Sequence, residues 1–341
     1  MAAFLRHNYK FCIPLYTMND DNSIPLTVSV VMCTYNGEQF LREQMDSILA
    51  QDYPLHEIIV QDDRSTDDTW DILQTYAKAH PGLFKLFRND EQLGFNRNFH
   101  TALLRATGQY VAISDQDDIW FPQKIRRQVE AIGEADLCYS DYYRDAHYTL
   151  PLHDHISPPC DMVSLTFCNT IPGHSMLIRR SFMLREEAWN DAFYYDWWFL
   201  ITAHLQGNGV AHVAEPLNWH RPHAASAIAQ IRHKQGWRHT VHPTWQPYLL
   251  GWFDLSRMRK QKAWKAFYLH LESHTSKAHF PLVHQLSKAL LHSWRTPQLC
   301  LLCVTHRNEV YPSCRGWKQI LRALFRPAIY AYGNTAFSIR F

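Results

Sequence analysis

Residues 108–120 read "GQYVAISDQDDIW", a short apolar run that is followed at once by three carboxylates, Asp115, Asp117 and Asp118. The run has the length and composition of a strand that is buried in a sheet. The acids have two interpretations. They could bind Mg²⁺ or Mn²⁺ through hard oxygen ligands, or they could form the acidic start of a helix near Phe121.

The same pattern of a short apolar run and a following helix occurs three times before this stretch. Strand-like runs lie at 26–33, 56–63 and 82–89, and amphipathic helical patterns follow at 40–49, 65–80 and 95–107. We expect Ser65 or Thr66 to cap the second of these helices. Strands that alternate with helices predict an α/β fold with a mostly parallel, Rossmann-like sheet flanked by helices.

Polar clusters follow three of the strands, in the segments "TYNGE", "QDDRSTDD" and "SDQDD". In a parallel sheet the carboxyl ends of the strands gather at one edge, and ligands bind there. The three clusters are therefore predicted to meet around one ligand.

The composition excludes several classes of protein. A formal charge of +2 over 341 residues gives no support for nucleic-acid binding. The eight Cys lack the paired spacing of a zinc site and are interpreted as reduced, which suits a cytoplasmic protein. No signal peptide is evident, and no window reaches the roughly 18 consecutive apolar residues of a spanning helix. The pattern after residue 226 predicts helices rich in Trp, His and Lys.

Two blocks of the sequence resemble the nucleotide-sugar-binding half of a family 2 glycosyltransferase with the GT-A fold. They are "VSVVMCTYNGEQFLREQMDSILAQDYPLHEIIVQDDRSTDDT" (28–69) and "GFNRNFHTALLRATGQYVAISDQDDIWFPQKI" (94–125). The form "SDQDDIW" is most similar to bacterial rhamnosyltransferase-like members. The resemblance implies a catalytic domain over 26–226, with a donor half (26–120) and an acceptor half (121–226), followed by a helical region at 227–341.

The resemblance also implies roles for the residues of the donor half. The first and second strand ends would contact the base and ribose, Asp115 would face the ribose or sugar, and Asp117 would ligate the cation that bridges the diphosphate. Asp118 matches a frequent following acid whose role is less defined. The implied donor-binding residues are Thr34, Tyr35, Asp62, Asp63, Asp115 and Arg221, where Asp62 supports the loop that carries Asp63.

On the acceptor side, Asp196 matches the family's general base, and Gly173, His174 and Trp197 are implied to contact the acceptor. From the residues alone, Trp197 could equally belong to a helix core, and His174 could bond backbone at a strand start. "HRPHAAS" (220–226) resembles the family's "YRxHxxxxS" motif, which adds His223 as a metal ligand. This sequence departs from that motif, because His220 replaces Tyr and the spacing to Ser226 is short.

The expected function is an inverting transfer of one sugar, from dTDP-rhamnose or a UDP-hexose, to a hydroxyl of a bacterial surface polysaccharide. The acceptor would be carried on a lipid at the inner face of the cytoplasmic membrane. The helical region could touch that membrane or pack on the catalytic domain. A catalytically inactive nucleotide- or glycan-binding member is the alternative. A nucleotidyltransferase is disfavoured, because "TYNGEQF" lacks the Lys of a glycine-rich phosphate loop.

Overall fold

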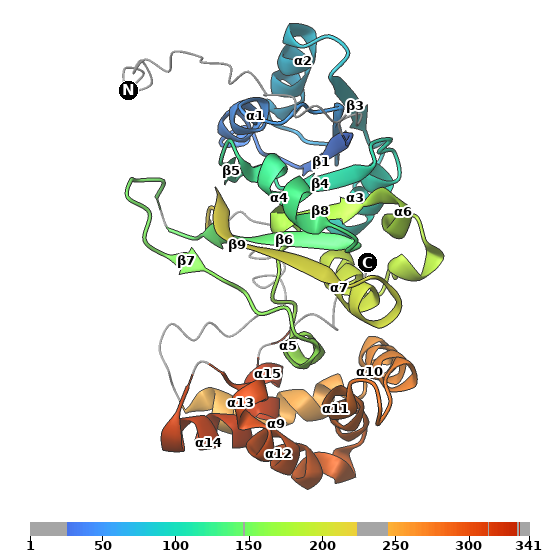
Figure 1. Ribbon diagram of the computed structural model, residues 1–341, viewed down its shortest axis with the longest axis vertical. Coiled ribbons are helices and arrows are strands. Elements are labelled where there is room, and N and C mark those ends of the chain that lie inside the picture. Colours follow the sequence, from blue (N-terminus) through green and yellow to red (C-terminus); the bar gives the residue numbers. More distant parts are fainter. Residues whose placement is uncertain (1–25, 146, 224–244, 313, 333, 335–341) are drawn as a thin grey trace.

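The computed structural model of the chain describes residues 26–145, 147–223, 245–312, 314–332 and 334. One part is a twisted sheet with helices on both faces, and the other is a set of helices below it (Figure 1). The predicted boundary between residues 226 and 227 falls within 224–244, outside the described residues.

The sheet has nine strands, in the order β3-β2-β1-β4-β8-β6-β9-β5, with β7 paired to β6. Neighbours from β3 to β4 are parallel, as predicted, whereas β8 runs antiparallel to β4 and to β6. The strands are β1 (Val28–Thr34), β2 (Glu57–Asp62), β3 (Phe84–Arg88), β4 (Tyr110–Ser114), β5 (Ile119–Trp120), β6 (Leu137–Tyr143), β7 (His155–Ile156), β8 (Met176–Arg179) and β9 (Val210–Trp219).

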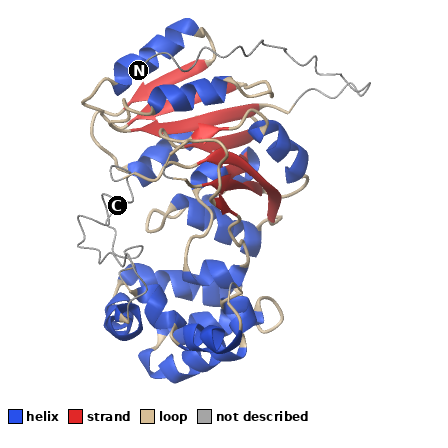
Figure 2. Cartoon of the chain, turned by 90° about the vertical axis from the view of Figure 1, so that its left-hand side faces the viewer, coloured by secondary structure: helices blue, strands red, loops and turns tan. Residues whose placement is uncertain are grey.

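Helices cover both faces of the sheet, because side chains along each strand alternate between two buried clusters. Figure 2 shows helices on both sides of the sheet. Val30 of β1 belongs to the same buried cluster as Leu41 and Ile72, whereas Val31 belongs to the cluster that contains Phe99. The helices of this part are α1 (Leu41–Leu49), α2 (Thr69–Ala79), α3 (Phe95–Leu103), α4 (Lys124–Ile132), α5 (Met162–Phe167), η1 (Gly173–Ser175), α6 (Arg180–Met183), η2 (Glu186–Ala188) and α7 (Tyr195–Gln206).

We call the remaining helices, residues 245–332, the helical lobe. It comprises α9 (Gln246–Met258), α10 (Lys262–His274), α11 (Pro281–Leu291), η3 (Ser293–Arg295), α12 (Thr296–Thr305), α13 (Arg307–Val310), α14 (Gly316–Leu324) and α15 (Arg326–Ala331). The lobe shares a buried cluster with α5 and α7. Phe267 of α10 packs against Trp197 with ring centroids 4.7 Å apart, and the Tyr268 hydroxyl donates to the Thr166 carbonyl at 2.9 Å.

The described helices are too short, and not apolar enough, for any of them to cross a membrane.

Candidate active site

The ends of β1, β2 and β4 bring the predicted polar clusters together at one edge of the sheet. Thr34 and Asp62, the last residues of β1 and β2, are paired in register, and Met32 of β1 pairs with Ser114 at the end of β4. The Thr34 hydroxyl donates to the Asp62 carboxylate at 2.9 Å. The pattern of parallel strands therefore predicted the location of this edge correctly.

Asp62 is fully buried and its carboxylate is used within the protein. It accepts hydrogen bonds from the Ser65 hydroxyl (2.5 Å) and the Ser65 N–H (3.0 Å), and it lies 3.3 Å from Arg88 Nε. These contacts agree with the predicted supporting role. The prediction that Ser65 or Thr66 caps the following helix is wrong. Helix α2 begins at Thr69, and the Thr69 N–H donates to the Asp67 carboxylate.

Asp63 is buried beside the next loop. Its carboxylate accepts from Asn89 Nδ2 at 2.7 Å and from the backbone N–H groups of Leu93 and Gly94 at 2.7 and 2.8 Å. These bonds fix the loop that leads into α3. The base contact implied for Asp63 stays a prediction, since three donors already hold its oxygens.

Gln116, which the sequence analysis did not single out, joins two of the clusters. Its side-chain oxygen accepts from the Tyr35 N–H at 2.9 Å, and its amide donates to the Tyr35 carbonyl at 3.1 Å. A Cβ on Gly37 would overlap this amide, so a larger residue there would require the Gln116 side chain to move. Tyr35 itself is exposed, which leaves its ring accessible to a ligand.

The two predicted metal ligands contact each other. Asp117 Oδ2 lies 2.6 Å from His223 Nε2, and both side chains are largely buried. Arg221 holds this pair in place, because its Nε donates to the Asp117 carbonyl at 3.0 Å while its guanidinium pairs with Glu43. The guanidinium also lies over the rings of Phe40 and Trp219. The phosphate contact implied for Arg221 stays a prediction. Residues 224–226 of the motif lie outside the described residues.

Asp118 forms a buried cluster with two histidines that the sequence did not predict to meet. Its Oδ1 lies 2.9 Å from His220 Nδ1 and accepts from the Arg221 N–H at 3.2 Å, and its Oδ2 lies 3.4 Å from His174 Nδ1. The two imidazoles stack with centroids 4.7 Å apart. The only sequence signal for this cluster was the substitution of His220 for the family's Tyr.

Burial and charge set the ionisation of this cluster. Burial opposes ionisation of Asp118, but the imidazoles of His174 and His220 and the Arg221 N–H outweigh it and lower the pKa of this carboxyl to about 2. Burial also opposes a charge on His220, but Asp118 outweighs that effect and raises the pKa of His220. Burial lowers the pKa of His174 to about 3, so this imidazole is neutral at pH 7. At neutral pH Asp118 is therefore ionised beside a neutral His174.

These contacts exclude the interpretation of the acids as a helix cap. Helix α4 begins at Lys124 after Gln123, and no side chain caps it. Asp117 and Asp118 bond His223, His220 and the Arg221 backbone instead.

The ligand atoms of Asp118, His174 and His220 all lie within 4.8 Å of one another, which is compatible with binding one metal ion. Asp118 Oδ2 and His174 Nε2 are buried without a hydrogen-bond partner. Together with the Asp117–His223 pair, this cluster provides carboxylate and imidazole ligands that suit a divalent cation such as Mn²⁺.

Asp196 lies in the first turn of α7 and is half-buried. Burial raises the pKa of Asp196 to about 6, although the Trp197 N–H at 2.8 Å and the Asn169 side chain act in the opposite direction. Burial, followed by the charges of Asp118 and Asp117, also holds the pKa of Asp115 well above its usual range, and Asp196 adds to this effect. Asp115 and Asp196 are thus close enough to interact.

Two of the implied acceptor contacts are buried. The Trp197 side chain is 2% exposed, and its Nε1 donates to the Leu165 carbonyl at 2.9 Å. This corrects the prediction that Trp197 contacts an acceptor, because the helical lobe covers the indole and makes it part of the core. His174 is also buried, behind Asp118. Gly173 packs so closely on the Tyr195 hydroxyl that a Cβ there would overlap it.

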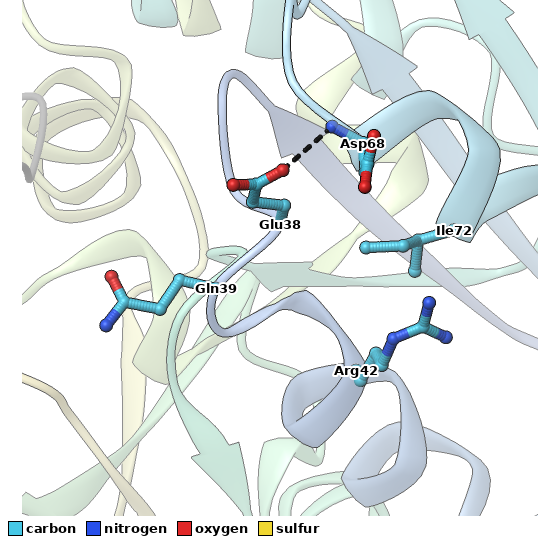
Figure 3. Close-up of a pocket in the computed structure, with 5 residues that line it drawn as sticks. All are labelled: Glu38, Gln39, Arg42, Asp68 and Ile72. Atoms are coloured by element: carbon cyan, nitrogen blue, oxygen red, sulfur yellow. Dashed lines mark hydrogen bonds between the residues drawn. The ribbon is translucent and has the colours of Figure 1, made fainter.

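A shallow depression of about 450 Å³ lies elsewhere, between α1 and α2, and is lined by Glu38, Gln39, Arg42, Asp68 and Ile72 (Figure 3). The Glu38 carboxylate accepts from the Asp68 N–H at 2.9 Å across it. The acids of the sheet edge do not line this depression, so we do not assign the site to it.

The mostly parallel sheet with acids at its carboxyl edge has the architecture of the GT-A class, and the family can be stated directly. Residues 29–201 match the model of glycosyl transferase family 2, and the chain belongs to this family.

Curated relatives agree with this assignment over part of their length. The chain is 33% identical over 125 residues to UDP-Glc:alpha-D-GlcNAc-diphosphoundecaprenol beta-1,3-glucosyltransferase WfaP of Escherichia coli, which covers 36% of this chain and 49% of WfaP. It is 32% identical over 114 residues to dTDP-rhamnosyl transferase RfbG of Shigella flexneri, which covers 32% of this chain and 39% of RfbG. The chain spans about half the length of the curated relatives it matches.

The fold has a close counterpart among solved structures. The crystal structure of S. aureus TarS 1-349 in complex with UDP-GlcNAc superposes with a TM-score of 0.56 at 15% identity, covering 92% of this chain and 91% of that chain. This likeness shows that the GT-A fold predicted from the sequence is correct, including a helical part after the sheet.

Proposed function

We propose that this protein transfers one sugar, with inversion, from a nucleotide diphosphate donor to a hydroxyl of a growing bacterial surface polysaccharide. The observation that carries the proposal is the meeting of the Asp117–His223 pair, Asp115 and Asp196 at one sheet edge. The sequence resemblance favours dTDP-rhamnose as donor, and a UDP-hexose is the other candidate. RfbG and WfaP, which are named for these two donor types, support both candidates.

A divalent cation, Mg²⁺ or Mn²⁺, fits the residues present. Asp117 and His223 would hold it, with the Asp118–His174–His220 cluster as the neighbouring set of ligands. When bound, the cation would neutralise the negative charge of the departing nucleoside diphosphate. Arg221 positions Asp117 through its backbone carbonyl, and Asp118 positions Arg221 and His220.

Asp196 is the proposed general base. Because its pKa is about 6, most of this carboxyl is ionised at pH 7 and can accept the proton of the attacking hydroxyl. A carboxylate with an ordinary pKa would be a weaker base. Burial is the cause of the raised pKa of Asp196, since a charged carboxylate is disfavoured where water is excluded.

The proposed acceptor is a lipid-linked glycan at the inner face of the cytoplasmic membrane. The support is the similarity to WfaP, whose name describes a diphosphoundecaprenol-linked acceptor. The proposed location is accordingly the cytoplasm, with a peripheral contact to that membrane.

The test is donor binding and donor hydrolysis across a panel of UDP-, GDP- and dTDP-sugars, with Mn²⁺, Mg²⁺ or EDTA. We expect the wild type to turn over one donor with a metal, and Asp117→Ala to lose this activity. Glu134→Ala, which removes an exposed loop carboxylate, is the matched control and should be unaffected.

Two outcomes would contradict the proposal. Failure of the wild type to bind any donor with any metal would favour an inactive glycan-binding member. Donor binding without turnover or transfer under every condition would favour an inactive nucleotide-binding member of the same fold.

A further inference from the structure

Helix α14 presents its apolar side chains away from the protein. Gln319 and Ala323 are buried against the rest of the lobe, and Gln319 Nε2 donates to the carbonyls of Arg307 (3.3 Å) and Tyr311 (3.0 Å). The exposed residues follow helical spacing on the opposite face: Trp317, Ile320, Leu321 and Leu324. Trp317 is 69% exposed. A helix that packs through a glutamine and displays a tryptophan and three aliphatic side chains has an unpartnered apolar face.

Helix α9 also carries a row of exposed apolar side chains. Trp245, just before the helix, and Leu249 and Phe253 within it are four residues apart and exposed on one face, while Leu255 and Met258 are buried. Phe325, which follows α14, contacts Tyr248 and Trp252 of α9 with ring centroids 5.3 and 6.1 Å apart. Phe325 thus joins the end of α14 to α9 within the helical lobe, at the lower end of the molecule (Figure 1). We call the exposed side chains of α9 and α14 the α9–α14 face.

Exposed apolar side chains are concentrated in the lobe. Of the sixteen exposed large apolar residues in the described parts of the chain, ten belong to residues 245–332. Scattered exposed residues are normal, but a contiguous patch marks an interaction surface.

The charge of the lobe indicates which partner covers this face. Residues 245–332 contain thirteen Lys and Arg against three Asp and Glu, although the whole chain carries only +2. Lys318 and Arg322 are exposed on α14 itself, next to the apolar residues. A second copy on the same face would bring two strongly basic lobes together, which is unfavourable. The neighbouring segments 224–244 and 335–341 contain no Asp or Glu that could complement the charge.

We propose that the α9–α14 face docks on a membrane surface rich in anionic lipid, with Trp317, Leu321 and Phe253 inserted among the headgroups. Basic side chains beside an apolar stripe with Trp at its edge are the features of a helix that lies in a membrane interface. The inference rests on the peripheral membrane contact proposed above and assigns the surface that makes it, but its test does not depend on the transfer reaction. It would place the catalytic part next to a lipid-borne acceptor.

The test is co-sedimentation of the full chain with vesicles, in the absence of donor and acceptor. We expect the chain to bind vesicles of phosphatidylcholine with phosphatidylglycerol more strongly than vesicles of phosphatidylcholine alone. At high salt, binding to the two kinds of vesicle should become equal. The double variant Trp317→Ser/Leu321→Ser should lower the partition coefficient at least about tenfold. Lys318→Glu/Arg322→Glu should lower it only on the anionic vesicles. Leu104→Ser, which removes a similarly exposed side chain of the catalytic part, is the control.

Three results would overturn the proposal. They are absence of binding to either vesicle, equal partition of wild type and Trp317→Ser/Leu321→Ser, or an oligomer that this variant abolishes while no vesicle binding is seen. An unchanged thermal midpoint shows that the variants fold. Donor hydrolysis is measured in parallel, so a failure of membrane docking is separable from a failure of the proposed transferase activity.

Discussion

Replacing Asp118 with asparagine tests the buried cluster beneath the sheet edge. The lowered pKa of Asp118, from a usual 3.8 to about 2, corresponds to about 2.5 kcal/mol of stabilisation at roughly 1.36 kcal/mol per unit. Asp118 is fully buried, so solvent screening does not reduce this contribution. We therefore expect Asp118→Asn to lower the free energy of unfolding by about 2–3 kcal/mol.

The loss should depend on pH with a definite sign. A lowered carboxyl pKa gives stabilisation that is present above pH 3.8 and is lost as the pH falls toward 2. The raised pKa of His220 gives stabilisation that is present below its usual 6.5 and is lost as the pH rises through the raised value. The interaction is thus complete near pH 5.5 and weaker at pH 9, and Asp118→Asn should cost more at pH 5.5.

Urea denaturation at both pH values, in EDTA, measures this difference. Glu134→Gln, an exposed carboxylate in a loop, serves as the control and should change stability by less than about 0.5 kcal/mol. The reasoning would be refuted if Asp118→Asn lowered the free energy of unfolding by less than about 0.5 kcal/mol, or by more at pH 9 than at pH 5.5.

Three further predictions concern α7 and the lobe. Asp196→Asn should lower kcat at least about 100-fold, and wild-type kcat should fall as the pH drops below 6, because the base becomes protonated; unchanged turnover in a transfer assay would contradict this. Trp197→Ala should cost about 3–5 kcal/mol in urea denaturation, since its indole is buried against Phe267. Gly251→Ala should cost about 1–3 kcal/mol, because its Cβ would overlap the Ala328 carbonyl; an unaltered thermal midpoint would show that α9 and α15 can separate.

The sequence predicted the fold where local pattern and topology coincide. Apolar runs with polar ends predicted β1, β2 and β4. Because parallel strands end together, they also predicted the edge at which Thr34, Asp62 and Ser114 end these strands. The sequence did not show that β8 is antiparallel to its neighbours, because a short apolar run looks the same in a parallel and in an antiparallel strand.

What the sequence did not predict depends on contacts between distant segments. His174 and His220 are 46 positions apart and stack only because η1 and the end of β9 meet below Asp118. From the residues alone, Trp197 fitted a helix core as well as an acceptor contact, and the packing of α10 on α7 puts it in the core. The hydroxyl of Ser65 had the chemistry of a cap, but the Asp62 carboxylate binds it.

The packing of α10 on α7 has a consequence for how the protein can be divided. The match to the family ends at residue 201, inside α7, yet the opposite side of that helix is covered by Phe267 and His270 of the lobe. A gene shortened to the family segment would expose Trp197 and Trp198 beside the proposed base. A fragment that keeps these indoles covered therefore has to include α10, and the lobe acts as a structural support for α7.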